Sequence, residues 1–323
     1  MKTMFVHIGH PKTGTSSIQE TFTASASVLE DYGVFHYAGY IDHHPIARRM
    51  HKASQRYHDI GVYKRFFAAA AATRCETGFF SSETLIRLQP DEIAAMVEQF
   101  RTVAEEIKVL IYVRHPVGYT VSATHQAVRL GQSLAALEKK PRLVDLKRIL
   151  PRWRDAMGAD NLIVRPFERA QMVNGDAVDD VLSVLGAGAA ADRLTRSQRN
   201  EGLSVLGIHV LDRVNQLQGR PLGRPNILRI NTLAGPRYVL PQETLDRARE
   251  LAVPHLEYLE AEFGITLAEP PQTPSPPLSL SPEELDTLAA LINELLPETR
   301  PPEAPERPRG VKRLVGSVLG LRG

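Results

Sequence analysis

The chain has 323 residues, of which 43% are hydrophobic and 24% charged, and its formal net charge is +2. This length suits one large α/β domain with additions, or two small domains. The balanced charge, the absence of a long basic run and the lack of an aromatic stacking pattern argue against nucleic acid as a partner. A single cysteine, Cys75, excludes an intramolecular disulfide and a cysteine-based metal site.

The first twenty residues carry the most specific pattern. A short apolar run at residues 4–8 leads into a segment rich in glycine and hydroxyl residues, Gly9-His10-Pro11-Lys12-Thr13-Gly14-Thr15-Ser16-Ser17. This order predicts a strand, an anion-binding loop and the start of a helix, because backbone N–H groups at a helix N-terminus bind anions. We therefore expect a ligand that carries phosphate or a similar oxyanion.

The loop differs from a Walker A sequence, in which lysine directly follows the second glycine. Gly9 and Gly14 have the required separation, but Thr15 stands where lysine would be, and Lys12 precedes Gly14 by two residues. The segment resembles instead the 5′-phosphosulfate loop of sulfotransferases that use PAPS (3′-phosphoadenosine-5′-phosphosulfate). The alternative is an ordinary glycine-containing turn between a strand and a helix.

A second pattern follows the apolar run at residues 109–113, which predicts a strand buried on both faces of a parallel sheet. Arg114 comes directly after this run, and Ser122 follows it by eight positions, early in the next predicted helix. Arginine at the carboxyl end of such a strand lies where open α/β sheets bind ligands, and it can hold a phosphate bidentately. The pattern resembles the 3′-phosphate site of the same family; a structural salt bridge of Arg114 is the alternative.

Candidate general bases follow a third apolar run. Phe79 and Phe80 indicate a short strand, and Glu83 comes just past its end. The resemblance implies that this position faces the acceptor, since many glycan-directed members place a glutamate there as the base. Glu83 could instead cap the next helix or pair with a lysine. Other members use histidine, which leaves His7, His10, His43, His44 and His58 as rivals.

The resemblance implies sulfuryl transfer from PAPS to a hydroxyl or amine acceptor, with no metal. The expected catalytic residues are Lys12, which would neutralise charge on the leaving oxygen, Glu83 and His10. Arg114 and Ser122 would anchor the 3′-phosphate. The remaining expected donor-binding residues are Pro11, Lys12, Thr13, Gly14, Thr15, Ser16 and Ser17. The alternatives are a P-loop nucleotide kinase and an inactive nucleotide-binding homologue.

The acceptor is less well defined by the sequence. Glu83 and a region rich in histidine and arginine, residues 40–60, favour a carbohydrate or glycolipid. This region could equally be a solvated helical face. The turn Arg199-Asn200-Glu201-Gly202 differs in detail from the corresponding family turn, so a ligand role there has little support.

Strands and helices are predicted to alternate along the chain. Helices are expected at residues 15–30, 66–74, 91–105, 117–130, 143–157 (interrupted at Pro151) and 175–185, and a further strand and turn at 161–168. Residues 133–141 are ambiguous. This alternation is typical of an α/β fold, and the resemblance specifies a P-loop-type three-layer sandwich with a central parallel sheet flanked by helices.

The resemblance covers roughly residues 1–210. We expect a sulfotransferase α/β domain at 1–268, with a helix at 243–263 bent by Pro254, and a Pro/Ser-rich linker at 269–282. A C-terminal helix at 283–298 is predicted by Ser281, Pro282 and Glu284, which form an N-cap pattern. Residues 299–323, rich in proline and basic residues, are expected to be disordered, with weak membrane-surface contact as an option.

No stretch approaches the ~20 apolar residues of a membrane span. The first apolar run covers residues 4–8 only and is assigned to the first strand. We therefore expect neither a signal peptide nor a transmembrane anchor, and a cytoplasmic location.

Overall fold

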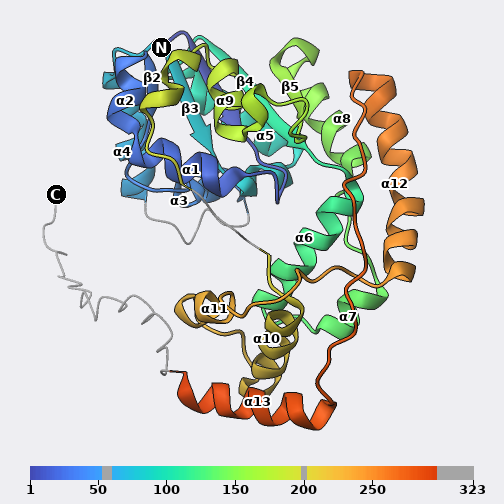
Figure 1. Cartoon of the computed structure of the whole chain (residues 1–323). Helices are drawn as coiled ribbons and strands as arrows, with labels where there is room; N and C mark the ends of the chain where they lie inside the picture. Colours follow the sequence, from blue (N-terminus) through green and yellow to red (C-terminus); the bar gives the residue numbers. More distant parts are fainter. Residues whose placement is uncertain (53–59, 198–201, 297–323) are drawn as a thin grey trace, which may run out of the picture.

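The computed structural model describes residues 1–52, 60–197 and 202–296. Within these residues, a sheet of five strands has the order β2-β3-β1-β4-β5, and neighbouring strands are parallel throughout (Figure 1). The strands are β1 (Thr3–His7), β2 (Val34–His36), β3 (Thr77–Ser81), β4 (Glu106–Val113) and β5 (Leu162–Pro166). Because β1 is central, the loop that follows it lies in the middle of the carboxyl edge of the sheet.

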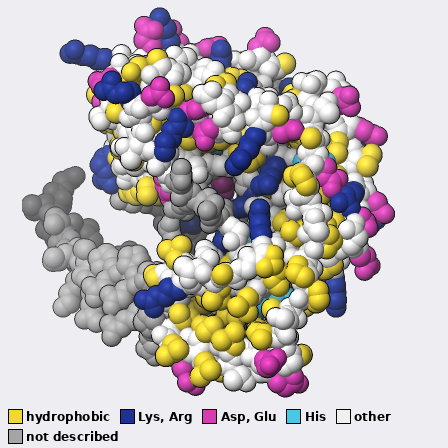
Figure 2. All heavy atoms as spheres, in the orientation of Figure 1, with side chains coloured by type: hydrophobic (Ala, Val, Ile, Leu, Met, Phe, Trp, Pro, Cys, Tyr) yellow, Lys and Arg dark blue, Asp and Glu magenta, His cyan; other side chains and the backbone are white. Residues whose placement is uncertain are grey.

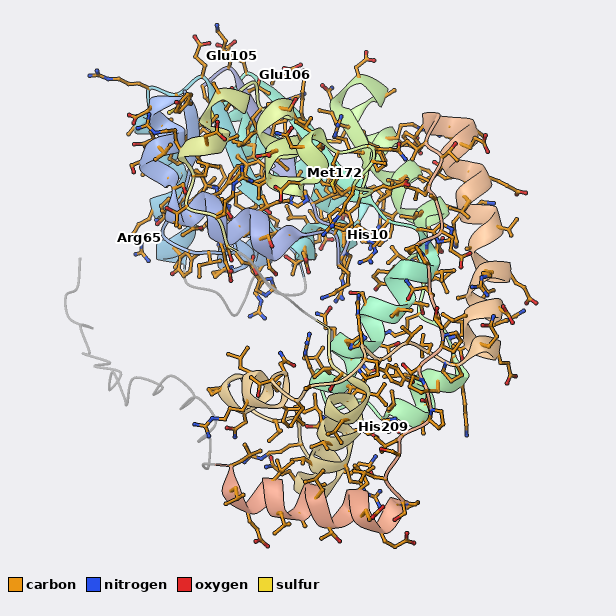
Figure 3. All side chains as sticks on the ribbon, in the orientation of Figure 1. His10, Arg65, Glu105, Glu106, Met172 and His209 are labelled. Carbon is orange, nitrogen blue, oxygen red and sulfur yellow. The ribbon has the colours of Figure 1, made fainter. Side chains whose placement is uncertain are left out.

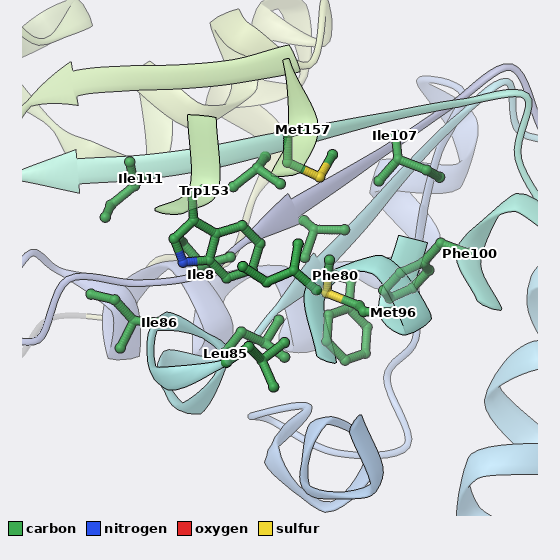
Figure 4. Close-up of a cluster of buried hydrophobic side chains, with 14 of the residues drawn as sticks. Ile8, Phe80, Leu85, Ile86, Met96, Phe100, Ile107, Ile111, Trp153 and Met157 are labelled. Atoms are coloured by element: carbon green, nitrogen blue, oxygen red, sulfur yellow. The ribbon is translucent and has the colours of Figure 1, made fainter. Parts of the chain in front are cut away.

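Hydrophobic side chains cover both faces of this sheet. In β4, Val109 and Ile111 belong to the cluster on one face, whereas Leu110 and Tyr112 belong to the cluster on the other. Helices α4 (Ile60–Ala72), α5 (Pro90–Arg101) and α8 (Leu146–Met157) pack on the first face, and α1 (Thr15–Ala24), α2 (Ala26–Asp31) and α9 (Ala177–Val184) pack on the second. Figure 4 shows part of the first cluster, with Trp153 at its centre. The predicted three-layer arrangement around a parallel sheet is confirmed.

A helical part lies beside the α/β layers (Figure 1). Helices α6 (Pro116–Arg129), α7 (Leu134–Lys139), α10 (Val205–Gln218), α11 (Arg224–Ile230) and α13 (Pro282–Leu295) surround a hydrophobic cluster of their own. Helix α12 (Gln242–Phe263) joins the two parts, because Leu245 belongs to the helical cluster and Leu259 to the cluster on the sheet. The remaining short elements are α3 (His44–Ala47) and the 3₁₀ helices η1 (Arg48–Met50), η3 (Glu83–Arg87), η4 (Ala159–Asn161), η5 (Val173–Gly175) and η6 (Gly188–Arg193).

Several predicted boundaries were wrong. The helix expected at 15–30 is divided into α1 and α2 at Ser25, and the helix expected at 66–74 begins already at Ile60. Pro151 does not interrupt α8, which continues through it to Met157. The lost backbone hydrogen bond is offset there by packing, because Leu150 and Trp153 are fully buried against the sheet. The ambiguous segment 133–141 contains α7.

The C-terminal prediction is confirmed at its N-cap. The Ser281 hydroxyl accepts a hydrogen bond from the Glu284 N–H, and the Glu284 carboxylate accepts one from the Ser281 N–H, which together form a capping box at the start of α13. The expected tail at 299–323 lies outside the described residues. Among the residues that are described, no helix combines the length and apolar character needed to cross a lipid bilayer.

An ion pair between a buried aspartate and a partly exposed arginine joins β4, β5 and α9. The Asp180 carboxylate, fully buried, accepts hydrogen bonds from the Tyr112 hydroxyl at 2.7 Å, from Arg165 Nε at 2.5 Å and Nη2 at 2.7 Å, and from the Val173 N–H at 3.0 Å. Burial alone would raise the pKa of this carboxyl, but the hydrogen bonds from Arg165 and Tyr112 hold the pKa below its ordinary value.

Replacing Asp180 tests this network. We expect Asp180→Asn to lower the free energy of unfolding at pH 7 by about 3 kcal/mol, because Arg165 would lose its charged partner. Asp286→Asn is the matched control, since it removes an exposed carboxylate from Arg213 and should change stability little. The pKa of Asp180 is lowered by folding, so its contribution is present above the unfolded pKa and is lost as the pH falls below about 4. If urea unfolding gave the same loss of unfolding free energy for both variants, the stabilising role of Asp180 would be contradicted.

Candidate functional site

A cavity of about 1560 Å³ opens at the carboxyl edge of the sheet, where the α/β layers meet the helical part. Its wall comes from the loop after β1, the end of β4, α6 and the segment after β5, and from three segments at 202–204, 231–237 and 267–271. Figure 2 shows Lys and Arg side chains in the hollow between the two parts. His10 and Met172 lie on this side of the α/β layers, whereas Glu105 and Glu106 lie at the opposite edge of the sheet (Figure 3).

The loop between β1 and α1 has an unusual backbone. Gly9, Lys12 and Gly14 have φ values of 54°, 67° and 74°, and Gly14 is the N-cap of α1. Such left-handed residues among right-handed ones turn successive N–H groups toward one side, which forms an anion-binding concavity. Lys12 is not a glycine, so its positive φ strains the backbone. Backbone strain of this kind is typical of functional sites. The backbone therefore supports the anion-binding loop that the sequence predicts.

Both glycines of the loop are also needed for space. A Cβ atom at Gly9 would lie 2.9 Å from Glu83 Cγ, and one at Gly14 would lie 3.1 Å from the Phe167 ring and 3.2 Å from Ala177 Cβ. The first contact shows that Glu83 packs directly against the loop. The second shows that Gly14 allows the segment after β5 to close against the start of α1.

Most of the expected donor-binding residues line the cavity. They are Lys12, Gly14, Thr15, Ser16, Ser17, Arg114 and Ser122, and the wall also includes Glu83. Pro11 and Thr13 are not part of the wall. The Thr13 hydroxyl donates to the His10 carbonyl at 2.5 Å and so helps to fix the loop. The Thr15 hydroxyl is buried and has no hydrogen-bond partner within the described part of the chain, so a ligand oxygen in the loop would satisfy it.

Arg114 places a positive charge beside this loop. Its Nη1 donates to the Lys12 carbonyl at 3.1 Å, and its guanidinium lies 5.8 Å from the centre of the Phe167 ring. Burial, followed by the charge of Arg237, lowers the pKa of Arg114. Arg114 makes no salt bridge to any carboxylate of residues 1–52, 60–197 or 202–296. The part of the wall formed by Arg114 and the loop therefore favours an anion.

The histidine candidates that the structure describes are not part of the cavity wall. Burial lowers the pKa of His7, His10 and His43 to about 4, so these side chains are neutral at pH 7. The His10 Nδ1–H donates to the Pro11 carbonyl at 2.9 Å, and the His43 Nε2–H donates to the Tyr37 carbonyl at 2.9 Å. His44 is also absent from the wall, and His58 lies outside the described residues. Of the candidate bases that are described, Glu83 is the one on the wall.

The region 40–60 contributes none of its described residues to the cavity wall. His43, Ile46 and Met50 are buried, and the last two belong to the hydrophobic cluster on the sheet. The turn at 199–201 lies outside the described residues, but Gly202 and Ser204 line the cavity.

The side chains of the wall that sequence reasoning missed include His115, Phe167 and Arg237. His115 comes next after Arg114, and Phe167 lies in the strand and turn predicted at 161–168, so their positions at the carboxyl edge offered a signal. Arg237 offered none, since it comes from the helical part, more than a hundred residues after Arg114.

No family model and no curated protein matches the sequence. Among solved structures, the chain is similar to a sulfotransferase from Alicyclobacillus acidocaldarius, with a TM-score of 0.46 and 16% identity over 83% of this chain and 98% of that one. It is also similar to a retinol dehydratase in complex with androsterone and the inactive cofactor PAP, with a TM-score of 0.35 and 12% identity over 80% of this chain and 82% of that one. Similarity of this degree does not specify an activity, which depends on the residues of this chain's own site.

Alanine at Gly14 tests the loop. Gly186 is the matched control, because its φ of 72° is similar but a Cβ there meets nothing within 4 Å. We expect Gly186→Ala to lower the free energy of unfolding by about 1 kcal/mol, the cost of the left-handed backbone. Gly14→Ala should lower the free energy of unfolding by roughly 1–3 kcal/mol more than Gly186→Ala does, because the new Cβ also crowds Phe167 and Ala177. Equal losses in urea unfolding would contradict the close packing at Gly14.

Proposed function

We propose that this protein is a sulfotransferase that moves a sulfuryl group from PAPS to a hydroxyl or amine acceptor. The observation that carries the proposal is that Lys12, Arg114, Ser122 and Glu83 line one cavity at the carboxyl edge of the parallel sheet. Residues far apart in the sequence thereby bring cationic and hydroxyl groups and a carboxylate to one cavity. That combination suits a donor with a 5′-phosphosulfate and a 3′-phosphate.

The residues of the cavity fit this donor. The loop N–H groups between Lys12 and Ser17, together with the unsatisfied Thr15 hydroxyl, would hold the 5′-phosphate. Arg114 and Ser122 would hold the 3′-phosphate through charge-assisted and neutral hydrogen bonds. The volume of about 1560 Å³ exceeds the ~300–1,000 Å³ typical of a site for one small molecule, which leaves space for an acceptor beside the donor.

Each side chain has a distinct chemical role in the proposed reaction. PAPS, when bound, supplies the sulfuryl group. Lys12 would stabilise the negative charge that develops on the leaving phosphate oxygen, and Glu83 would take the proton from the attacking acceptor. Arg114 and Ser122 would hold the donor in a fixed position relative to Glu83. We assign His10 to the support of the loop, since it is neutral and hydrogen-bonded to the Pro11 carbonyl.

We propose a carbohydrate or glycolipid as the acceptor. In support, the cavity wall carries polar side chains that can bind sugar hydroxyl groups, including Gln126, Glu168, Asn231 and Thr232. A carboxylate base beside the loop suits the deprotonation of a hydroxyl group.

Nucleotide binding tests the donor assignment. We expect PAP (3′,5′-ADP) to bind at least ~10-fold more tightly than 5′-ADP, without Mg²⁺, because Arg114 adds a charge-assisted bond to the 3′-phosphate. Arg114→Ala should remove most of this preference in calorimetric titrations. Arg247→Ala, which removes an exposed arginine outside the cavity wall, is the control and should retain it. Equal affinity of the wild-type protein for the two nucleotides, or binding of 5′-ADP only with Mg²⁺, would contradict the proposal.

The assignment of Glu83 as the base can be tested by turnover of labelled PAPS with a panel of glycan, glycolipid and phenol acceptors. We expect Glu83→Gln to lower kcat by ~10²-fold or more while PAP affinity is retained, because the amide cannot accept the proton. Glu98→Gln on the exposed surface of α5 is the matched control and should leave kcat unchanged. A Glu83→Gln variant with wild-type kcat would assign the base to another group.

A further inference from the structure

The turn that carries Glu83 is held by residues that do not line the cavity. Glu83 lies on the cavity wall, whereas residues 40–52, the first part of the region rich in histidine and arginine, are absent from it. Two histidines of this segment nevertheless form hydrogen bonds to the chain on either side of Glu83. The segment therefore contacts the site through the backbone of the turn.

The first contact lies two residues before Glu83, at the end of β3. The Ser81 N–H donates to His43 Nδ1 at 3.2 Å, and the His43 N–H donates to the Ser81 carbonyl at 3.2 Å. The His43 ring is buried, and its Nε2–H donates to the Tyr37 carbonyl at 2.9 Å. His43 thereby joins the chain that follows β2 to the residue that ends β3.

The second contact lies one residue after Glu83. The His51 Nε2–H donates to the Thr84 carbonyl at 3.0 Å. Within the turn, the Thr84 and Ser82 hydroxyl oxygens lie 3.0 Å apart, so a hydrogen bond between them spans Glu83. The hydrogen bonds of a 3₁₀ helix such as η3 have poorer geometry than those of an α-helix, so contacts from other segments contribute to its position.

The loop between β1 and α1 leaves Glu83 little room to move. A Cβ atom at Gly9 would lie 2.9 Å from Glu83 Cγ and 3.2 Å from its Cα. The backbone of the turn, as well as the side chain, thus packs against the loop. A shift of the turn would move the carboxylate relative to a bound donor, and a misplacement of ~1 Å can lower a reaction rate by about 10²-fold.

We propose that His51 is a positioning residue that holds Glu83 at the loop, and that His43 anchors the other side of the same turn. The inference rests on the proposed function, in which Glu83 is the base. His51 is absent from the cavity wall, so its effect would pass through the Thr84 carbonyl. This segment would then serve the chemical step rather than the binding of the acceptor.

Hydrogen–deuterium exchange of the full chain tests the contact without any substrate. His51→Phe removes the donor but keeps a planar ring, whereas His51→Gln keeps a side-chain N–H donor. We expect faster exchange over residues 82–88 in His51→Phe than in the wild-type protein, and restored protection in His51→Gln. Lys52→Ala is the matched control, since it removes an exposed ion pair with Asp91 and should leave this exchange unchanged. Wild-type exchange over 82–88 in His51→Phe would overturn the inference.

Turnover of labelled PAPS, with an acceptor that the wild-type protein uses, tests the positioning role. We expect His51→Phe to lower kcat by ~10-fold, with KM for PAPS and the affinity for PAP nearly unchanged, because the donor does not contact His51. His51→Gln should recover most of the rate. In a Glu83→Gln background, His51→Phe should not lower the residual turnover further, since the base that it positions is gone.

The outcomes separate this inference from the proposed function. With an active wild-type protein, an unchanged kcat in His51→Phe would overturn the inference and leave the proposed function intact. Losses that multiply in the double variant, or a loss of PAP affinity equal to the loss of kcat, would assign His51 a general structural role. A wild-type protein without turnover of PAPS would overturn the proposed function and, with it, the role of Glu83.

Discussion

The left-handed turn between β1 and α1 is the constraint on which the rest of the site depends. With positive φ at Gly9, Lys12 and Gly14, the backbone directs its N–H groups to one side. The same conformation brings three other elements against the loop: Glu83 packs at Gly9, Phe167 packs at Gly14, and Arg114 binds the Lys12 carbonyl. The loop is therefore the point at which the ends of β3, β4 and β5 are brought together, and it is the surface that we propose for an anion.

The second feature of the site is that two structural parts share it. The carboxyl edge of the sheet supplies one wall of the cavity, and the segments 202–204 and 231–237 supply the other. Helix α12 contacts both hydrophobic clusters, and His125 of α6 holds the paired segments by two hydrogen bonds. Apolar packing along α12 therefore joins the two parts, and the cavity lies between them.

Burial separates the roles of the ionisable residues. His7, His10 and His43 were plausible bases from the sequence, yet burial lowers their pKa to about 4 and their hydrogen bonds support the backbone and neighbouring side chains. Glu83, in the first turn of η3, lies on the cavity wall. The distinction depends on whether a side chain is buried in the interior or lies on the cavity wall, and this is a property of packing rather than of residue type.

The sequence by itself determined the parallel α/β sheet, the glycine-containing loop after the first strand and the places of Arg114, Ser122 and Glu83, because each follows a short apolar strand whose carboxyl end fixes where the next residues lie. It also determined the capping box at Ser281, which depends only on neighbours in the chain. Only the tertiary structure decided that α8 continues through Pro151, that His10 is buried and absent from the cavity wall, and that Arg237 of the helical part lines the same cavity as Arg114. These outcomes depend on packing and pairing between segments far apart in the chain, and local patterns of residues carry no information on such contacts.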